Sequence, residues 1–120
     1  MAPRWSPDGG RLAALSEDQK KVLIYDVRAG AWSERAEGIL LTGLTWSGDG
    51  AFLFFQDLLE ADQPVYRVGP PGRAPERVAD FRESLIGGAF RSGLVGLTPE
   101  GDLLVVLSRN HPDIYALDLE

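Results

Sequence analysis

The sequence predicts an all-β fold made of three similar antiparallel units, as in a β-propeller. The first observation is a recurring motif: Trp5-Ser6-Pro7-Asp8-Gly9 returns 41 residues later as Trp46-Ser47-Gly48-Asp49-Gly50, and Leu97-Thr98-Pro99-Glu100-Gly101 is a weaker third copy. The second is the period, because a repeat of about 40 residues is the signature of a propeller blade. The third is the 14 glycines and 8 prolines between short apolar runs, which are typical of many strands joined by turns.

The first unit, residues 1–38, is expected to form a blade of four antiparallel strands. Ser, Pro and Gly stand where a type I turn favours them in residues 6–9, so this turn should join an inner strand to a second strand. Residues 16–19 have the spacing of a helix capping box, but no helical apolar stripe follows, and we interpret them as a polar loop. The strands are expected at residues 2–5, 11–16, 22–27 and 31–36. The second strand is almost wholly apolar, which predicts burial on both faces.

The second unit, residues 39–81, repeats this order. The spacing from turn glycine to tyrosine is 16 residues in both units, from Gly9 to Tyr25 and from Gly50 to Tyr66. A loop or a single helical turn is expected at residues 57–63. The strands are expected at residues 41–46, 51–55, 65–68 and 76–81.

The third unit, residues 82–120, begins with a glycine-containing insertion at residues 82–93, which forms a loop or widens the inner strand. Its strands are expected at residues 94–97, 103–107 and 114–117, and a turn is expected at Asn110-His111-Pro112. This blade therefore lacks its outer strand. The last strand is an unpaired edge that another chain segment should cover, or that Asp118 and Glu120 keep soluble.

The repeat resembles that of TolB-type, WD-like β-propellers. The resemblance rests on Pro3-x-Trp5-Ser6-Pro7-Asp8-Gly9-Gly10-Arg11-Leu12-Ala13 followed by Ile24-Tyr25-Asp26-Val27; it is weaker in the second unit and weakest in the third. It implies the fold and says little about function. Residues 113–119 also resemble the C-terminus of bacterial regulators that join a winged-helix DNA-binding domain to a propeller. That resemblance implies the sensory or interaction tail of a transcriptional regulator.

Composition excludes several classes of function. The net charge is −6, so we expect no direct nucleic-acid binding by this segment. No cysteine occurs, and no stretch of 18 apolar residues, so we expect neither disulfides nor membrane insertion. No signal peptide precedes the first repeat, which favours the cytoplasm slightly over the periplasm without deciding the compartment.

The residues offer no catalytic constellation, and we expect no enzyme activity, cofactor or metal. The single histidine, His111, stands in a predicted turn and no nucleophile elbow is present. Asp57, Glu60 and Asp62 could coordinate Ca²⁺ or act as paired carboxylates, but they lack the pattern of an EF-hand loop, and a solvated loop is the favoured interpretation.

Three blades imply an incomplete ring, because propellers close with about 4 to 8. Two copies would give six blades, so we predict a homodimer. The function expected is a non-enzymatic module that binds a protein or a small ligand. The alternatives are the regulator tail and an accessory propeller of a peptidase-type enzyme. Trp5 and Trp46 are expected to pack between blades. The expected interaction surface consists of Trp32, Ile114, Tyr115 and Leu117.

Overall fold

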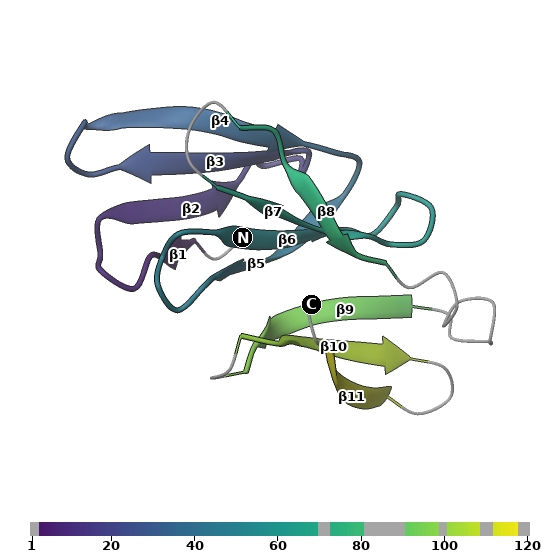
Figure 1. The fold of residues 1–120 in the computed structure, drawn as a ribbon. Coiled ribbons are helices and arrows are strands. Elements are labelled where there is room, and N and C mark those ends of the chain that lie inside the picture. Colours follow the sequence, from purple (N-terminus) through teal and green to yellow (C-terminus); the bar gives the residue numbers. More distant parts are fainter. Residues whose placement is uncertain (1–2, 70–72, 81–90, 99–100, 109–111, 118–120) are drawn as a thin grey trace.

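The computed structural model describes residues 3–69, 73–80, 91–98, 101–108 and 112–117, and within them the chain is all-β. It forms three antiparallel sheets that follow one another along the sequence (Figure 1). The first sheet contains β1 (Arg4–Trp5), β2 (Arg11–Leu15), β3 (Lys21–Asp26) and β4 (Ala31–Glu37). The second contains β5 (Leu41–Trp46), β6 (Leu53–Asp57), β7 (Val65–Val68) and β8 (Glu76–Ala79). The third contains β9 (Arg91–Leu97), β10 (Leu103–Ser108) and β11 (Pro112–Leu117).

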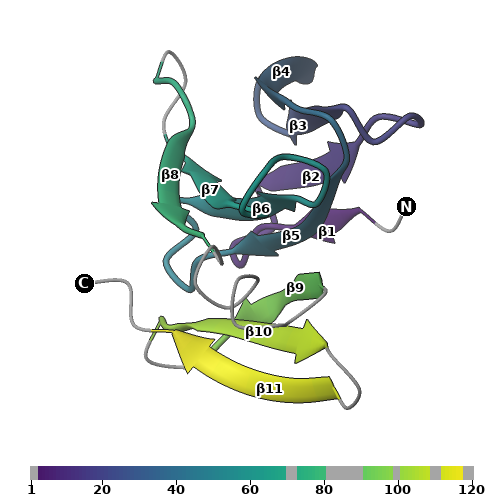
Figure 2. The same ribbon diagram turned by 90° about the vertical axis from the view of Figure 1, so that its right-hand side faces the viewer.

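The sheets are arranged face to face, with the second between the other two (Figure 2). The first strand of each sheet lies on the same side of the molecule, and β5 contacts both β1 and β9. This is how the blades of a propeller are placed, with their first strands innermost. In the described part of the chain no helix is long and apolar enough to cross a membrane.

The core consists of two apolar layers, one between each pair of neighbouring sheets. The first sheet contributes mainly β-branched and small side chains, and the second contributes larger ones, Phe55 among them. The layer between the first and second sheets contains Ala13, Leu15, Val22, Ile24, Ala36, Leu41, Leu44, Leu53, Phe55 and Val68. The layer between the second and third contains Phe54, Val65, Leu94, Leu103 and Val105.

Burial differs between β2, which the sequence predicts to be covered on both faces, and β6, its counterpart in the second sheet. All five residues of β6 are buried. In β2 burial alternates: Ala13 and Leu15 are buried, whereas Leu12 and Ala14 are only half-buried. The reason is position, because β6 has a sheet on each side and β2 has one on a single side within the described residues.

Most strands differ from the sequence prediction at one or both ends, but only the start of β9 differs by more than two residues. The second strand of the second sheet begins at Leu53 rather than at residue 51, and β9 begins at Arg91, so part of the predicted insertion is strand. Residues 81–90, 109–111 and 118–120 lie outside the described residues, and with them the rest of the insertion, the His111 turn and the acidic end. Residues 16–19 form a loop, as predicted.

The tight turn that opens each repeat has the same geometry in all three sheets. The backbone N–H of Gly9, Gly50 and Gly101 donates to the carbonyl of Ser6, Ser47 and Thr98 respectively, at 2.9 Å in each case. These glycines have φ of 74°, 73° and 92°, a left-handed conformation that strains any residue with a Cβ. The recurring glycine is therefore a backbone requirement of the turn.

Candidate functional site

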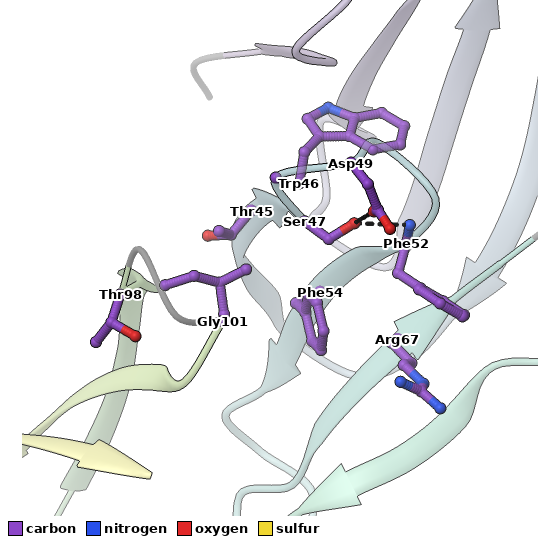
Figure 3. Close-up of a pocket in the computed structure, with 11 residues that line it drawn as sticks. Thr45, Trp46, Ser47, Asp49, Phe52, Phe54, Arg67, Thr98 and Gly101 are labelled. Atoms are coloured by element: carbon purple, nitrogen blue, oxygen red, sulfur yellow. Dashed lines mark hydrogen bonds between the residues drawn. The ribbon is translucent and has the colours of Figure 1, made fainter. Parts of the chain in front are cut away.

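A pocket of about 540 Å³ lies between the second and third sheets, at the end where their tight turns stand (Figure 3). Phe52, Phe54 and Arg67 come from the second sheet, and Thr98 and Gly101 stand on the opposite side of the pocket. Phe54 is buried and forms an apolar floor. The remaining lining residues are Thr45, Trp46, Ser47, Gly48, Asp49 and Leu97.

The rim of the pocket carries a fixed carboxylate. Asp49 Oδ1 accepts a hydrogen bond from the Ser47 hydroxyl at 2.7 Å and from the Ala51 backbone N–H at 3.0 Å. These two donors, the hydroxyl first, lower the pKa of Asp49 below its ordinary value. Asp49 is therefore ionised at neutral pH and held in one orientation beside the pocket.

A cation covers the aromatic wall of the same pocket. The Arg67 guanidinium carbon lies 4.3 Å from the centroid of the Phe52 ring, within the range of a cation–π contact. The same guanidinium forms an ion pair with Glu76 on β8. The wall thus presents an aromatic ring with a cation over its face.

A second surface faces away from the body of the molecule, on the first sheet. Directly opposed residues of an antiparallel pair share a face, and the registers Trp5↔Leu12, Leu12↔Tyr25 and Tyr25↔Trp32 place these four side chains in one row. The Tyr25 and Trp32 rings lie 5.2 Å apart at 53°. We call this face, with Ala14 and Leu23 beside the row, the outer wall. Trp5 is 58% exposed and Trp32 is 53% exposed.

The predicted interaction residues are only partly described. Trp32 lies on the outer wall, exposed as an interaction surface requires. The backbones of Ile114, Tyr115 and Leu117 lie in β11 and pair with Val106, Val105 and Leu103, but the side chains of these three residues lie outside the described part. The structure therefore places Trp32 on the first sheet and β11 on the third, and does not bring them together within one chain.

Two other predictions need correction. Trp46 packs between sheets as expected, but its counterpart Trp5 is exposed because no sheet covers that side of the first sheet in the described structure. Asp57 was expected in a solvated loop and is instead buried at the end of β6. Its carboxylate accepts from the backbone N–H groups of Ile39, Leu40 and Leu59 at 2.9, 3.0 and 3.3 Å.

The other two acidic residues of that loop have separate partners. The Tyr66 hydroxyl donates to Glu60, and Asp62 forms an ion pair with Arg77 at 3.8 Å. Among the residues described, no three His, Cys, Asp or Glu side chains come close enough to hold a metal ion.

Sequence reasoning missed the pocket, although one signal for it was present. Leu97 stands in the third repeat where Trp5 and Trp46 stand in the first two. A leucine at a packing position that the other two repeats fill with tryptophan predicts unfilled space beside it. The sequence could not show that the neighbouring side chains leave this space open.

The chain matches no protein-family model and no curated protein sequence. Solved structures are similar to it in fold. TolB from Acinetobacter baumannii superposes with a TM-score of 0.73 and 21% identity, over 98% of this chain and 29% of that one. Dihydro-heme d1 dehydrogenase NirN in complex with DHE superposes with a TM-score of 0.63 and 18% identity, over 98% of this chain and 28% of that one.

These likenesses show a TolB-like β-propeller fold, and together with the antiparallel sheets they confirm the predicted all-β propeller class. The chain spans less than a third of the length of either solved structure. At this level of identity the comparison concerns the fold alone, and function has to be argued from the surfaces of this chain.

Proposed function

We propose that this chain is a non-enzymatic binding module, a half-propeller of three blades that completes its ring by pairing with a second copy of itself. The observation that carries the proposal is the outer wall. Its row of Trp5, Leu12, Tyr25 and Trp32 is an apolar sheet face on which no described strand packs, and exposed faces of this kind mark interfaces.

The repeat itself supports a blade as the occupant of the outer wall. On the second sheet the same face, which carries Trp46, Leu53 and Phe55, is packed against the first sheet. Its surroundings are therefore known from this chain: a neighbouring sheet that offers small and β-branched side chains. The free face of the third sheet includes Leu104, which is half-buried while its neighbours Leu103 and Val105 are buried toward the second sheet.

A second copy allows this contact to form twice. In a two-fold dimer the outer wall of one protomer would meet the third sheet of its partner, and the partner's outer wall would meet the third sheet of the first. Two such contacts fall in the range of obligate interfaces, about 2,000 Å² or more in total. The completed ring would then present its turns and pockets to a protein or a small ligand.

The test is the mass of the chain in solution. Sedimentation equilibrium should give twice the protomer mass of 13.1 kDa, and the thermal midpoint should rise with protein concentration. A mass of one protomer that does not depend on concentration would overturn ring completion by self-association.

Two variants locate the interface. A double variant with Trp5→Ser and Trp32→Ser should be monomeric, because both rings lie on the outer wall. Leu59→Ser is the matched control, since Leu59 is 63% exposed in the loop between β6 and β7, away from that wall. A double variant that remains dimeric would place the contact elsewhere.

The regulator-tail interpretation stays a prediction. It rests on residues 113–119, and Asp118 and Leu119 lie outside the described residues.

A further inference from the structure

The indole of Trp46 packs at the turn end of the space between the first and second sheets. Its Nε1–H donates to the carbonyl oxygen of Arg4 at 2.9 Å. The Arg11 guanidinium carbon lies 5.0 Å from the centroid of the ring, as in a cation–π contact. The indole therefore has an apolar body between two sheets, a hydrogen-bond acceptor at its edge and a cation on its face.

Among the described residues, none places such a ring at the corresponding position between the second and third sheets. Trp46 is the last residue of β5, and Leu97 is the last residue of β9. Each precedes its tight turn, and each opposes the first residue of the next strand, Leu53 or Leu103. Leu97 is thus the counterpart of Trp46, but its side chain has neither an aromatic ring nor an N–H group.

The surroundings of the missing ring are the walls of the pocket. The counterpart of Arg4 is Thr45, because each comes directly before the tryptophan of its repeat. The counterpart of Arg11 is Phe52, because both donate their backbone N–H to the turn serine, at 3.0 Å in each case. Thr45, Phe52 and Leu97 all line the pocket. The pocket therefore lies at the place between the second and third sheets that corresponds to the place of the Trp46 indole between the first and second.

The chemistry of the pocket also suits such a ring. Phe52, Phe54 and Leu97 supply apolar contact, and Arg67 supplies a cation beside the aromatic wall. A carbonyl oxygen has two lone pairs, so the Thr45 carbonyl can accept an additional N–H, as that of Arg4 does. The volume of about 540 Å³ lies within the range of small-molecule sites and leaves room for atoms flanking the ring.

We propose that this pocket binds an indole-type aromatic group, and that its occupant is a tryptophan side chain presented by a partner polypeptide. The group would replace the tryptophan that the third repeat lacks. Both walls belong to one chain, so the site does not depend on ring completion by a second copy, and the two proposals can fail separately.

The test is a titration of the wild-type chain with N-acetyl-L-tryptophanamide, in which ¹H–¹⁵N NMR detects binding. Binding should shift amide signals of residues 45–54, 67 and 97–98, with at least tenfold weaker binding of N-acetyl-L-leucinamide. Free indole should bind more weakly than the tryptophanamide if the natural occupant is part of a polypeptide. Equal or tighter binding of free indole would overturn the polypeptide occupant, and shifts confined to the outer wall, or none, would overturn the site.

The variant Leu97→Trp supplies the ring within the chain. It should fill the pocket, raise the thermal midpoint and weaken probe binding at least tenfold. Leu59→Trp is the matched control, because it adds an indole at an exposed loop position and should leave probe binding unchanged. Undiminished binding to a folded Leu97→Trp chain would overturn the proposal. If that variant does not fold, the map of shifts in the wild-type chain decides the question.

Discussion

Asp57 shows how a residue that resembles a surface acid can be structural. Its carboxylate satisfies three backbone N–H groups, two of them in the segment that links the first sheet to the second. Gly38 makes the approach possible, since a Cβ there would come within 2.6 Å of Asp57 Oδ2 and 2.5 Å of Leu41 Cδ2. No local pattern in the sequence reveals the contact with the linking segment, because those two donors lie 17 and 18 residues away along the chain.

Replacing Asp57 with asparagine should destabilise the fold by about 2 kcal/mol or more. The carboxamide turns N–H groups toward backbone donors, and losing hydrogen bonds to a buried charged group costs roughly 1.5–3 kcal/mol. Urea unfolding followed by circular dichroism measures the change. Glu17→Gln is the control, an exposed acid for which about 0.5 kcal/mol or less is expected. Equal stability of the Asp57 variant and wild type would show that the carboxylate is not needed for the linking segment.

Gln56, the residue before Asp57, forms hydrogen bonds to the loop after β6 and to the third sheet. It is fully buried; its amide nitrogen donates to the Gln63 carbonyl at 3.1 Å, and its Oε1 accepts from the Leu94 backbone N–H at 2.9 Å. Two adjacent polar residues at the end of β6 thus bind the chain on both sides of the second sheet. The sequence analysis predicts a loop from Asp57 onward, and the burial of both residues is explained only by the partners that the fold provides.

At the scale of elements, the repeat predicted the strands well and their pairing less well. Tyr25 opposes Leu12 on β2, whereas Tyr66 opposes Phe55 on β6 rather than Leu53, the counterpart of Leu12. The loop between β6 and β7, residues 58–64, is longer than the loop at residues 16–20 by two residues. A shift of two keeps every side chain on its original face, so the equal spacing seen in the sequence concealed it.

The serine–aspartate turn is an element used more often than the sequence analysis recognised. Ser16 and Asp18 repeat the contacts of Ser6 and Asp8, with the hydroxyl donating to the carboxylate at 2.7 Å in both turns. Gln19 takes the place of the turn glycine with φ of 59°. The substitution of glutamine for glycine hid the motif, because the left-handed position is the part that sequence reasoning expects to be glycine.

These turns should make stability depend on pH in acid. Donors lower the pKa of Asp8 (the Gly10 N–H, then the Ser6 hydroxyl), Asp18 (the Ser16 hydroxyl, then the Lys20 N–H) and Asp49 below 3.8. Because the folded-state pKa is depressed, the stabilisation is complete above the unfolded value and is lost as the pH falls through the folded value.

Urea midpoints measured at about pH 5 and about pH 3 test this expectation, with the unfolded-state value near 3.9 between them. A variant with Asp8→Asn, Asp18→Asn and Asp49→Asn should be less stable than wild type at the higher pH. The difference between the urea midpoints of variant and wild type should be smaller at the lower pH. The same difference in urea midpoint at both pH values would mean that ionisation of these carboxylates does not stabilise the fold.

At the scale of the whole molecule, one repeat unit has different surroundings in each place. Leu12 and Leu53 both oppose the tryptophan of their own repeat, Trp5 and Trp46. Leu53 is 0% exposed between two sheets, whereas Leu12 is half-buried on the outer wall. The sequence predicted an incomplete ring, but which side chains remain exposed follows only from the register of the strands.

A comparison of alanine substitutions at Leu12 and Leu53 tests whether a second copy covers the outer wall. Leu53→Ala should cost about 3 kcal/mol or more at any protein concentration, since it removes a fully buried side chain. Leu12→Ala should cost about 1 kcal/mol where the chain is monomeric, because part of that side chain already contacts water. As protein concentration rises and a second copy covers the wall, the cost of Leu12→Ala should approach that of Leu53→Ala. Unfolding curves at low and high protein concentration compare the two variants, and a cost for Leu12→Ala that stays small throughout would mean that no second copy packs there.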